Sequence, residues 1–177
     1  LTTSSAASDV YKRQVYGYIG VGSGKTATFE AGARVHFHEN SGIIVGTGGT
    51  MIVNGEESID KKLMEGEVVF EGDRLEPGYE NIPGQWGAIW LTSGSTQHQF
   101  HHATIKNATV GILMDFNDET NDPTLTISNS QIHNSAAANL WGKTAYIVAK
   151  NTVFGNAGQY SFIGSIGGDY KFTHCTF

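Results

Sequence analysis

A short pattern written four times constrains this chain more than any other feature. The copies read HHATIKN, NSQIHN, NTVFGN and HCTF, and the last copy ends at residue 177. Aligned, they give one polar column, one apolar column three residues later, and one asparagine column two residues beyond that. The three columns are His102, Asn129, Asn151 and His174; Ile105, Ile132, Phe154 and Phe177; and Asn107, Asn134 and Asn156. The first column recurs at 102, 129, 151 and 174, in steps of 27, 22 and 23 residues, which indicates a repeat architecture.

The residues between the columns predict strands. Apolar residues alternate with polar ones, as in Leu125 and Ile127 or Tyr170 and Phe172, and alternation at a period of two is typical of strands. A second alignment places GILM (111–114) over ANLW (138–141) and SFIG (161–164). Two or three short strands in about 23 residues describe one coil of an all-β parallel β-helix. Such coils stack about 4.8 Å apart, so the asparagines of successive coils are expected to form ladders and the apolar columns to form core stacks.

Residues 1–14 do not share this pattern. Read back into codons, Ser4 to Gln14 match a reading frame through a transposon-end adapter used in sequencing libraries. We therefore predict that residues 1–14 are an artefactual or disordered tail and leave them out of the fold argument. The predicted domain is 15–177, expected to be incomplete at its C-terminal end. At 23 to 27 residues a coil, 177 − 14 = 163 residues give about six or seven coils.

Composition limits the classes of function. The net charge of −6 argues against nucleic acid as a partner, because nucleic-acid sites normally show a basic stripe. The sequence has no run of apolar residues long enough to predict a membrane span. Cys175 is the single cysteine, so no disulfide can form within the chain, and we expect it to be a small core or ladder residue.

The first coils are less regular. TATFEAG (26–32) aligns with TMIVNGE (50–56) at a step of 24, which places Phe29 over Val53. Between them, RVHFHENSG alternates, so His36 and His38 are expected to face solvent. Two histidines at this spacing could contribute to a metal site, but zinc requires a third and a fourth convergent ligand. We therefore assign no metal ligands here.

Three inserts interrupt the rhythm. SIDKKLMEGEVVFEGDR (58–74) brings charges before a strand that returns at Val68 to Phe70, and 72–85 is the longest turn-rich stretch. Long loops on a rigid scaffold often carry function. WGAIWL follows, in which alternation places Trp86 and Trp90 on one side and Ile89 and Leu91 on the other. We expect Trp86 to pack under the preceding loop; exposed aromatic platforms for sugar stacking are the alternative.

The third insert, 114–123, is acidic. Its oxygen-bearing side chains are Asp115, Asn117, Asp118, Glu119, Asn121 and Asp122, a set that could bind calcium. It lacks the glycine and the terminal glutamate of an EF-hand loop. We expect a solvated acidic turn and predict no cofactor, no metal and no catalytic residue for this chain.

These segments together resemble a known family. EVVFEGDR, NIPGQWGAIWL, NATVGILM, LTISNSQIHN and YKFTHCTF, preceded by VYGYIGV and ATFEAGARVHFHENSGIIV, are similar to the right-handed parallel β-helix proteins of gut Bacteroidota. The resemblance covers nearly everything from Val15 onward. It implies a right-handed helix of pectate-lyase-like architecture, an N-terminal lipoprotein signal and a location at the cell envelope. It brings no catalytic residues with it.

Three functional hypotheses follow. The first is a noncatalytic surface module with a structural or recognition role, whose partner is a carbohydrate or another surface protein. The second is a polysaccharide lyase or glycoside hydrolase with its active site in coils beyond this sequence, because the fold alone does not decide function. The third is an adhesin or autotransporter-like passenger. Few carboxylates lie on the regular strands, and Arg34 and Arg74 are the only arginines after residue 14, which favours the first hypothesis.

Overall fold

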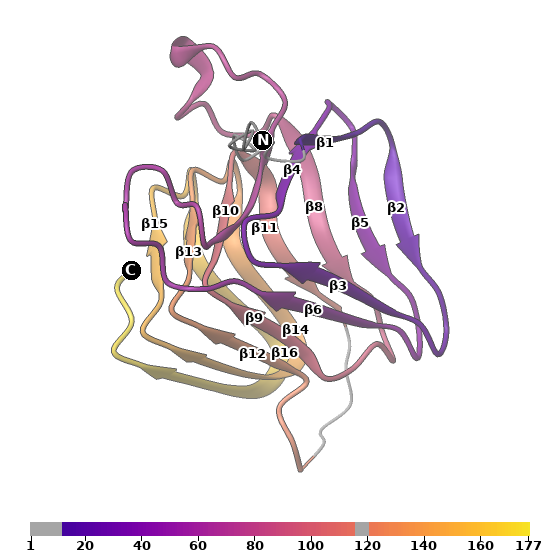
Figure 1. Ribbon diagram of the computed structural model, residues 1–177. Helices are drawn as coiled ribbons and strands as arrows, with labels where there is room; N and C mark the ends of the chain where they lie inside the picture. The colour runs from indigo at the N-terminus through magenta and orange to yellow at the C-terminus, as the bar shows by residue number, and fades with distance from the viewer. Residues whose placement is uncertain (1–11, 116–120) are drawn as a thin grey trace, which may run out of the picture.

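The computed structural model describes residues 12–115 and 121–177, and this part of the chain is built from sixteen strands and one 3-10 turn, η1 (Pro77–Tyr79). The chain winds as a parallel β-helix, and each coil contributes one strand to sheet A and two strand segments to sheet B. Every strand pairing between coils is parallel (Figure 1). The all-β parallel β-helix predicted from the repeats is therefore confirmed.

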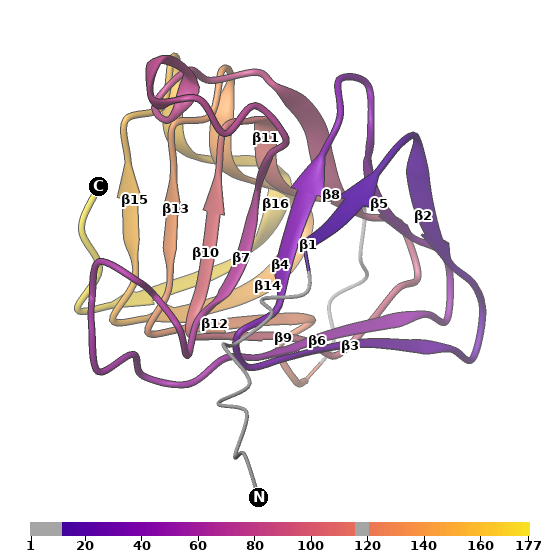
Figure 2. The ribbon, with the colours of Figure 1, turned by 45° about the horizontal axis from the view of Figure 1, so that its top comes forward.

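Sheet A has six strands, one for each coil, so the fold has six coils (Figure 2). They are β1 (Lys12–Val15), β4 (Arg34–Phe37), β7 (Val68–Gly72), β10 (Ala103–Lys106), β13 (Gln131–His133) and β15 (Val153–Gly155). Strand β1 begins at Lys12, so residues 12–14 of the segment set aside on sequence grounds pair with β4.

Sheet B folds around the other two sides of each coil. Its first side holds β2 (Tyr18–Val21), β5 (Gly42–Val45), β8 (Trp86–Leu91) and β11 (Ala108–Met114). Its second side holds β3 (Thr26–Glu30), β6 (Thr50–Asn54), β9 (His98–His101) and β12 (Leu125–Ser128). The long strands β14 (Ala138–Lys150) and β16 (Tyr160–Thr173) run through both sides, because β14 pairs with β11 and then with β12.

The apolar column of the repeat is the centre of the core. Ile105 pairs with Ile132, and Ile132 pairs with Phe154; all three are buried. The ring of Phe177 stacks on that of Phe154, with centroids 5.2 Å apart. Towards the N-terminus the column continues through Phe70 and Val35. Phe29 pairs with Val53 as predicted, and Cys175 packs against the C-terminal end of the same core.

The polar columns are the corners of the coils. His102, Asn129, Asn151 and His174 all have positive φ, between 45° and 53°, and the three asparagines of the other column have φ between 50° and 65°. Asparagine tolerates this left-handed conformation better than most residues, which explains why it recurs there. Asn151 Nδ2 donates to Asn129 Oδ1 at 2.7 Å, so the predicted ladder forms in the first column.

The second alignment was wrong by one residue. Ile112 pairs with Leu140, and Leu140 pairs with Phe162, whereas the sequence alignment placed Ile112 over Asn139. The corner after Asn134 holds one more residue than the corner after Asn107, because Ala138 pairs with Val110. In strands, a slip of one residue exchanges the core side for the solvent side.

The tryptophans of β8 also depart from simple alternation. The pairing of β8 with β11 shifts register between Ala88 and Ile89, and an irregularity of this kind breaks the alternation of sides. Trp86 is therefore buried on the same side as Ile89 and Leu91, while Trp90 is 36% exposed. Trp86 is buried, as expected, but in the core, where its ring stacks on that of Phe37 with centroids 4.3 Å apart. The prediction that both tryptophans share a side is wrong.

Candidate functional site

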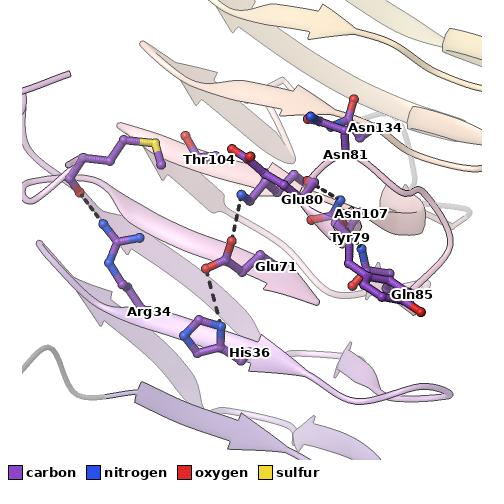
Figure 3. A network of polar contacts seen from close by, with 12 residues as sticks. Arg34, His36, Glu71, Tyr79, Glu80, Asn81, Gln85, Thr104, Asn107 and Asn134 are labelled. Atoms are coloured by element: carbon purple, nitrogen blue, oxygen red, sulfur yellow. Dashed lines mark hydrogen bonds and ion pairs between the residues drawn. The ribbon is translucent and has the colours of Figure 1, made fainter. Parts of the chain in front are cut away.

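Two inserts bracket the ends of the sheet A strands. Insert 55–67 lies where these strands begin, held by the Arg34 guanidinium, which donates to the carbonyls of Leu63 and Met64. Insert 73–85 lies where they end, held by Asn107, whose amide donates to the carbonyls of Glu80 and Ile82 at 3.0 and 2.9 Å (Figure 3).

The second asparagine column therefore does more than turn the chain. Asn134 Nδ2 donates to Asn81 Oδ1 at 3.0 Å, and Gln85 donates to the Tyr79 carbonyl from within the insert. Asn107 and Asn134 are 3% and 4% exposed. These corner amides bind insert 73–85, rather than each other.

A row of titratable side chains crosses the outer face of sheet A between the inserts. We call His36, Glu71, Lys106 and His133 the charged row; they occupy one register position on β4, β7, β10 and β13. Glu71 lies 3.4 Å from His36 Nδ1 and 2.8 Å from Lys106 Nζ. Figure 3 shows His36 and Glu71 pointing toward one another.

The row is enclosed rather than open. Beside it, Val69 and Thr104 are 0% and 1% exposed although they face outward, and the Thr104 hydroxyl donates to Glu67 at 2.6 Å. Burial lowers the pKa of His133, and the positive charge of Lys106 lowers it further. Since Glu71 lies between His36 of the preceding coil and Lys106 of the following one, the charged row joins three neighbouring coils.

His36 of β4 and His38, which follows the strand, were both expected to face solvent, and only one of them does. His38 is exposed, with Nδ1 2.8 Å from Asp73 Oδ2. His36 is 3% exposed, so the prediction that it faces solvent was wrong. It lies outside the core, on the face that alternation assigns to solvent, but Glu71 of the next coil lies 3.4 Å from its Nδ1.

His38 and Asp73 border a shallow hollow of about 470 Å³, together with Arg74, Leu75 and Glu76. Arg74 lies 3.5 Å from Glu76 and stacks its guanidinium on the Tyr79 ring at 3.9 Å. The charges of the hollow are thus paired with one another along the base of insert 73–85.

Carboxylates suited to glycoside hydrolysis would lie about 5–10 Å apart. The two on the outer face of sheet A, Glu67 and Glu71, are four residues apart along an extended chain, about 13 Å between Cα atoms. Each is already engaged, Glu67 by Thr104 and Glu71 by Lys106. The geometry gives these two residues a cross-coil structural role.

The acidic insert is only partly within the described residues, since Asn117, Asp118 and Glu119 lie outside them. Asp115 binds Lys143 and Trp90. Within 12–115 and 121–177, no group of three or more His, Cys, Asp or Glu side chains converges as a metal site.

The first side of sheet B carries a different outer face. Ile44, Trp90, Leu113, Trp141 and Ile163 occupy one register position on five successive coils, and we call them the tryptophan row. Their chain neighbours Ile43, Ile89, Leu91, Ile112 and Leu140 are fully buried. The row therefore points outward, and Trp90 is its most exposed member.

A polar network pins the two indole rings. Trp90 Nε1 donates to Asp115 Oδ2 at 3.0 Å, and Asp115 Oδ1 accepts an ion pair from Lys143 at 2.9 Å. Lys143 Nζ lies 4.9 Å from the centre of the Trp141 ring, and Trp141 Nε1 donates to Ser165 Oγ at 3.1 Å. Each ring N–H is bound by a residue of the following coil, so each indole is held diagonally along the sheet.

Sequence reasoning missed this site. Trp141 and Lys143 entered only as strand residues, and Asp115 only as a candidate calcium ligand. The available signal was the repeat itself: correct pairing of ATVGILM with ANLWGK places Trp141 beside Leu113, but the one-residue slip hid it.

Comparisons with known proteins add no relative to these observations. No family model, no curated protein and no solved structure matches the chain. Over the described residues, no helix has the length and apolar character needed to cross a membrane. What is shown for the described residues is the fold, a parallel β-solenoid of six coils.

Proposed function

We propose that the chain is a noncatalytic recognition module that binds a carbohydrate along the tryptophan row. The observation that carries this proposal is the pinned pair Trp90 and Trp141, which lie on one exposed face two coils apart. Binding sites combine apolar and aromatic surface with a few placed polar groups. Indole faces supply such surface for the C–H groups of sugar rings, and Asp115, Lys143 and Ser165 supply hydrogen-bonding groups beside them.

The rigid scaffold supports this function. Hydrogen bonds that hold the rings before binding remove part of the ordering cost of association. Trp90 is pinned by Asp115 and Trp141 by Ser165, on strands whose inward residues are fully buried. The family resemblance adds a location at the cell envelope to the proposal.

The test is calorimetric titration of the purified chain against a panel of oligosaccharides and polysaccharides. Trp90→Ala and Trp141→Ala are each expected to weaken binding at least about tenfold, equivalent to roughly 1.4 kcal/mol, while Trp→Phe retains part of it. Tyr79→Ala is the matched control. The exposed fraction of Tyr79, 38%, is similar to the 36% of Trp90, but Tyr79 lies on insert 73–85, away from the tryptophan row.

Folded Trp90→Ala and Trp141→Ala variants that bind as tightly as the unchanged chain would contradict the proposal. So would absence of binding to every glycan. A partner protein captured through the same two tryptophans would replace carbohydrate as the ligand. The lyase, hydrolase and adhesin hypotheses stay predictions.

A further inference from the structure

The tryptophan row sets the direction of any ligand that covers it. Its members lie on β5, β8, β11, β14 and β16 at one register position, and Figure 1 shows β5, β8 and β11 side by side. The row therefore crosses the strands and runs along the axis of the solenoid. A ligand that contacts both indoles must be extended along that axis.

The spacing of the rings sets the shape of the ligand. Trp90 and Trp141 are separated by β11 alone, which is two steps of about 4.8 Å between parallel strands. One coil is close to the length of one pyranose ring in an extended chain, so the two indoles suit rings that are two apart. Leu113 lies between them, half-buried, and continues the apolar strip.

The orientation of the rings favours a flat ligand. Both indoles donate from Nε1 to a residue of the next coil, at 3.0 and 3.1 Å. The same diagonal hydrogen bond on two coils therefore directs both ring N–H groups toward the following coil. A ribbon-like chain presents successive sugar faces in one plane, whereas a helically twisted chain turns them away.

The charges beside the row favour a neutral ligand. Asp115 and Lys143 pair with each other at 2.9 Å, so together they offer no net charge to a ligand. Thr92 and Ser165, which occupy the same flanking position on other coils, are uncharged. The whole chain carries −6, which disfavours the approach of polyanions.

From this geometry we infer that the ligand of the tryptophan row is a neutral glycan with an extended, ribbon-like backbone, such as a β-1,4-linked hexose chain, bound parallel to the solenoid axis. The inference rests on the proposed function and narrows it to one class of carbohydrate. It excludes uronate-rich and sulfated chains and helical α-linked glucans as preferred ligands.

Three oligosaccharide series test it on the intact chain: β-1,4-linked gluco- or manno-oligosaccharides, α-1,4-linked gluco-oligosaccharides and oligogalacturonides, each from two to eight rings. Affinity for the β-1,4 series is expected to rise with length until about five rings, one for each coil of the row at about 4.8 Å, and then level off. We expect that affinity to change less than twofold between low and high salt. The other two series should bind at least tenfold more weakly.

Two variants separate the possible outcomes. Trp141→Ala should lower the affinity for long β-1,4 chains to that of short ones, because it removes one of the two indoles that a long chain contacts together. Lys143→Gln should leave the preference for neutral chains in place. The inference would be overturned if oligogalacturonides bound more tightly than the neutral chains and lost that binding at high salt and in Lys143→Gln. If that binding also required Trp90 and Trp141, the proposed function would still stand. If no series binds and Trp90→Ala changes nothing, both fail.

Discussion

The outer faces of sheet A and of sheet B each carry an ion pair between neighbouring coils, but the two pairs have different surroundings. On each, a carboxylate and a lysine of the following coil form an ion pair, Glu71 with Lys106 at 2.8 Å and Asp115 with Lys143 at 2.9 Å. On sheet A the pair lies between two inserts, beside the buried Thr104. On sheet B the pair lies against two indole rings. One pair thus joins two neighbouring strands between the inserts, and the other lies against the rings of the tryptophan row.

The difference comes from what surrounds each pair. Inserts 55–67 and 73–85 are attached through Arg34 and Asn107 at the two ends of the sheet A strands. The side chains of the pair between them are each 12% exposed, against 15% for Asp115 and 23% for Lys143 on sheet B. Charged groups removed from water need their partners much more than exposed ones do. We therefore expect the sheet A pair to govern stability and the sheet B pair to govern ligand binding.

The largest expected effect is that of Glu71→Gln. The substitution leaves Lys106 covered without its carboxylate, and breaking a buried pair costs about 3 kcal/mol. The free energy of unfolding from urea titrations measures it. Asp115→Asn, on the other face, should cost less, about 1–2 kcal/mol, because the Asp115 and Lys143 side chains are 15% and 23% exposed and a lost charged hydrogen bond costs this much.

Glu57→Gln provides the baseline for this comparison, because Glu57 and Lys61 form an ion pair in which both side chains are mostly exposed. We expect no measurable change in stability for it. Equal losses for Glu71→Gln and Asp115→Asn would show that the inserts do not set the two faces apart.

The next prediction concerns the pH dependence of stability that arises from His98, which is buried in the interior of the solenoid. His98 is fully buried; its Nδ1 accepts from the Met51 N–H at 3.1 Å and its Nε2 lies 3.0 Å from Ser95 Oγ. Burial lowers the pKa of His98 to about 4 from its ordinary 6.5. The folded state thus favours neutral His98, so its contribution is fully present above pH 6.5 and is lost as pH falls toward 4.

The expected loss reaches about 3 kcal/mol, since each pKa unit corresponds to about 1.4 kcal/mol. Urea titrations between pH 7 and pH 4 measure it. In His98→Gln the fall of stability with pH should be shallower. An identical slope in both proteins would assign the acid sensitivity to other groups, His133 of the charged row first among them.

The smallest effect isolates the attachment of insert 73–85. Asn107→Gly keeps the left-handed corner, where φ is 65°, but removes the two bonds to the insert. We expect a loss of about 1–2 kcal/mol and faster hydrogen exchange confined to 73–85. Asn156→Gly is the matched control, because Asn156 occupies the same corner of the sixth coil with its side chain exposed. Equal exchange in the two variants would contradict the anchoring role.

The sequence by itself determined the coils. A fixed asparagine and a fixed apolar residue at each turn report local backbone geometry and inward direction, and both are properties of one coil repeated. This is why the pairing of Ile105, Ile132 and Phe154 and the pairing of Phe29 with Val53 were predictable. The asparagine ladder follows from the same stacking.

Only the tertiary structure decided which outward side chains are covered and which coils are in register beyond the corners. Alternation places His36 outside the core but does not predict that its side chain is buried there beside Glu71. One extra residue after Asn134 and a register shift in β8 moved Trp141 and Trp90 into a common row. Side chains of a strand alternate between its two faces, and a single inserted residue exchanges the faces. The face on which the tryptophan row lies therefore depended on contacts between coils.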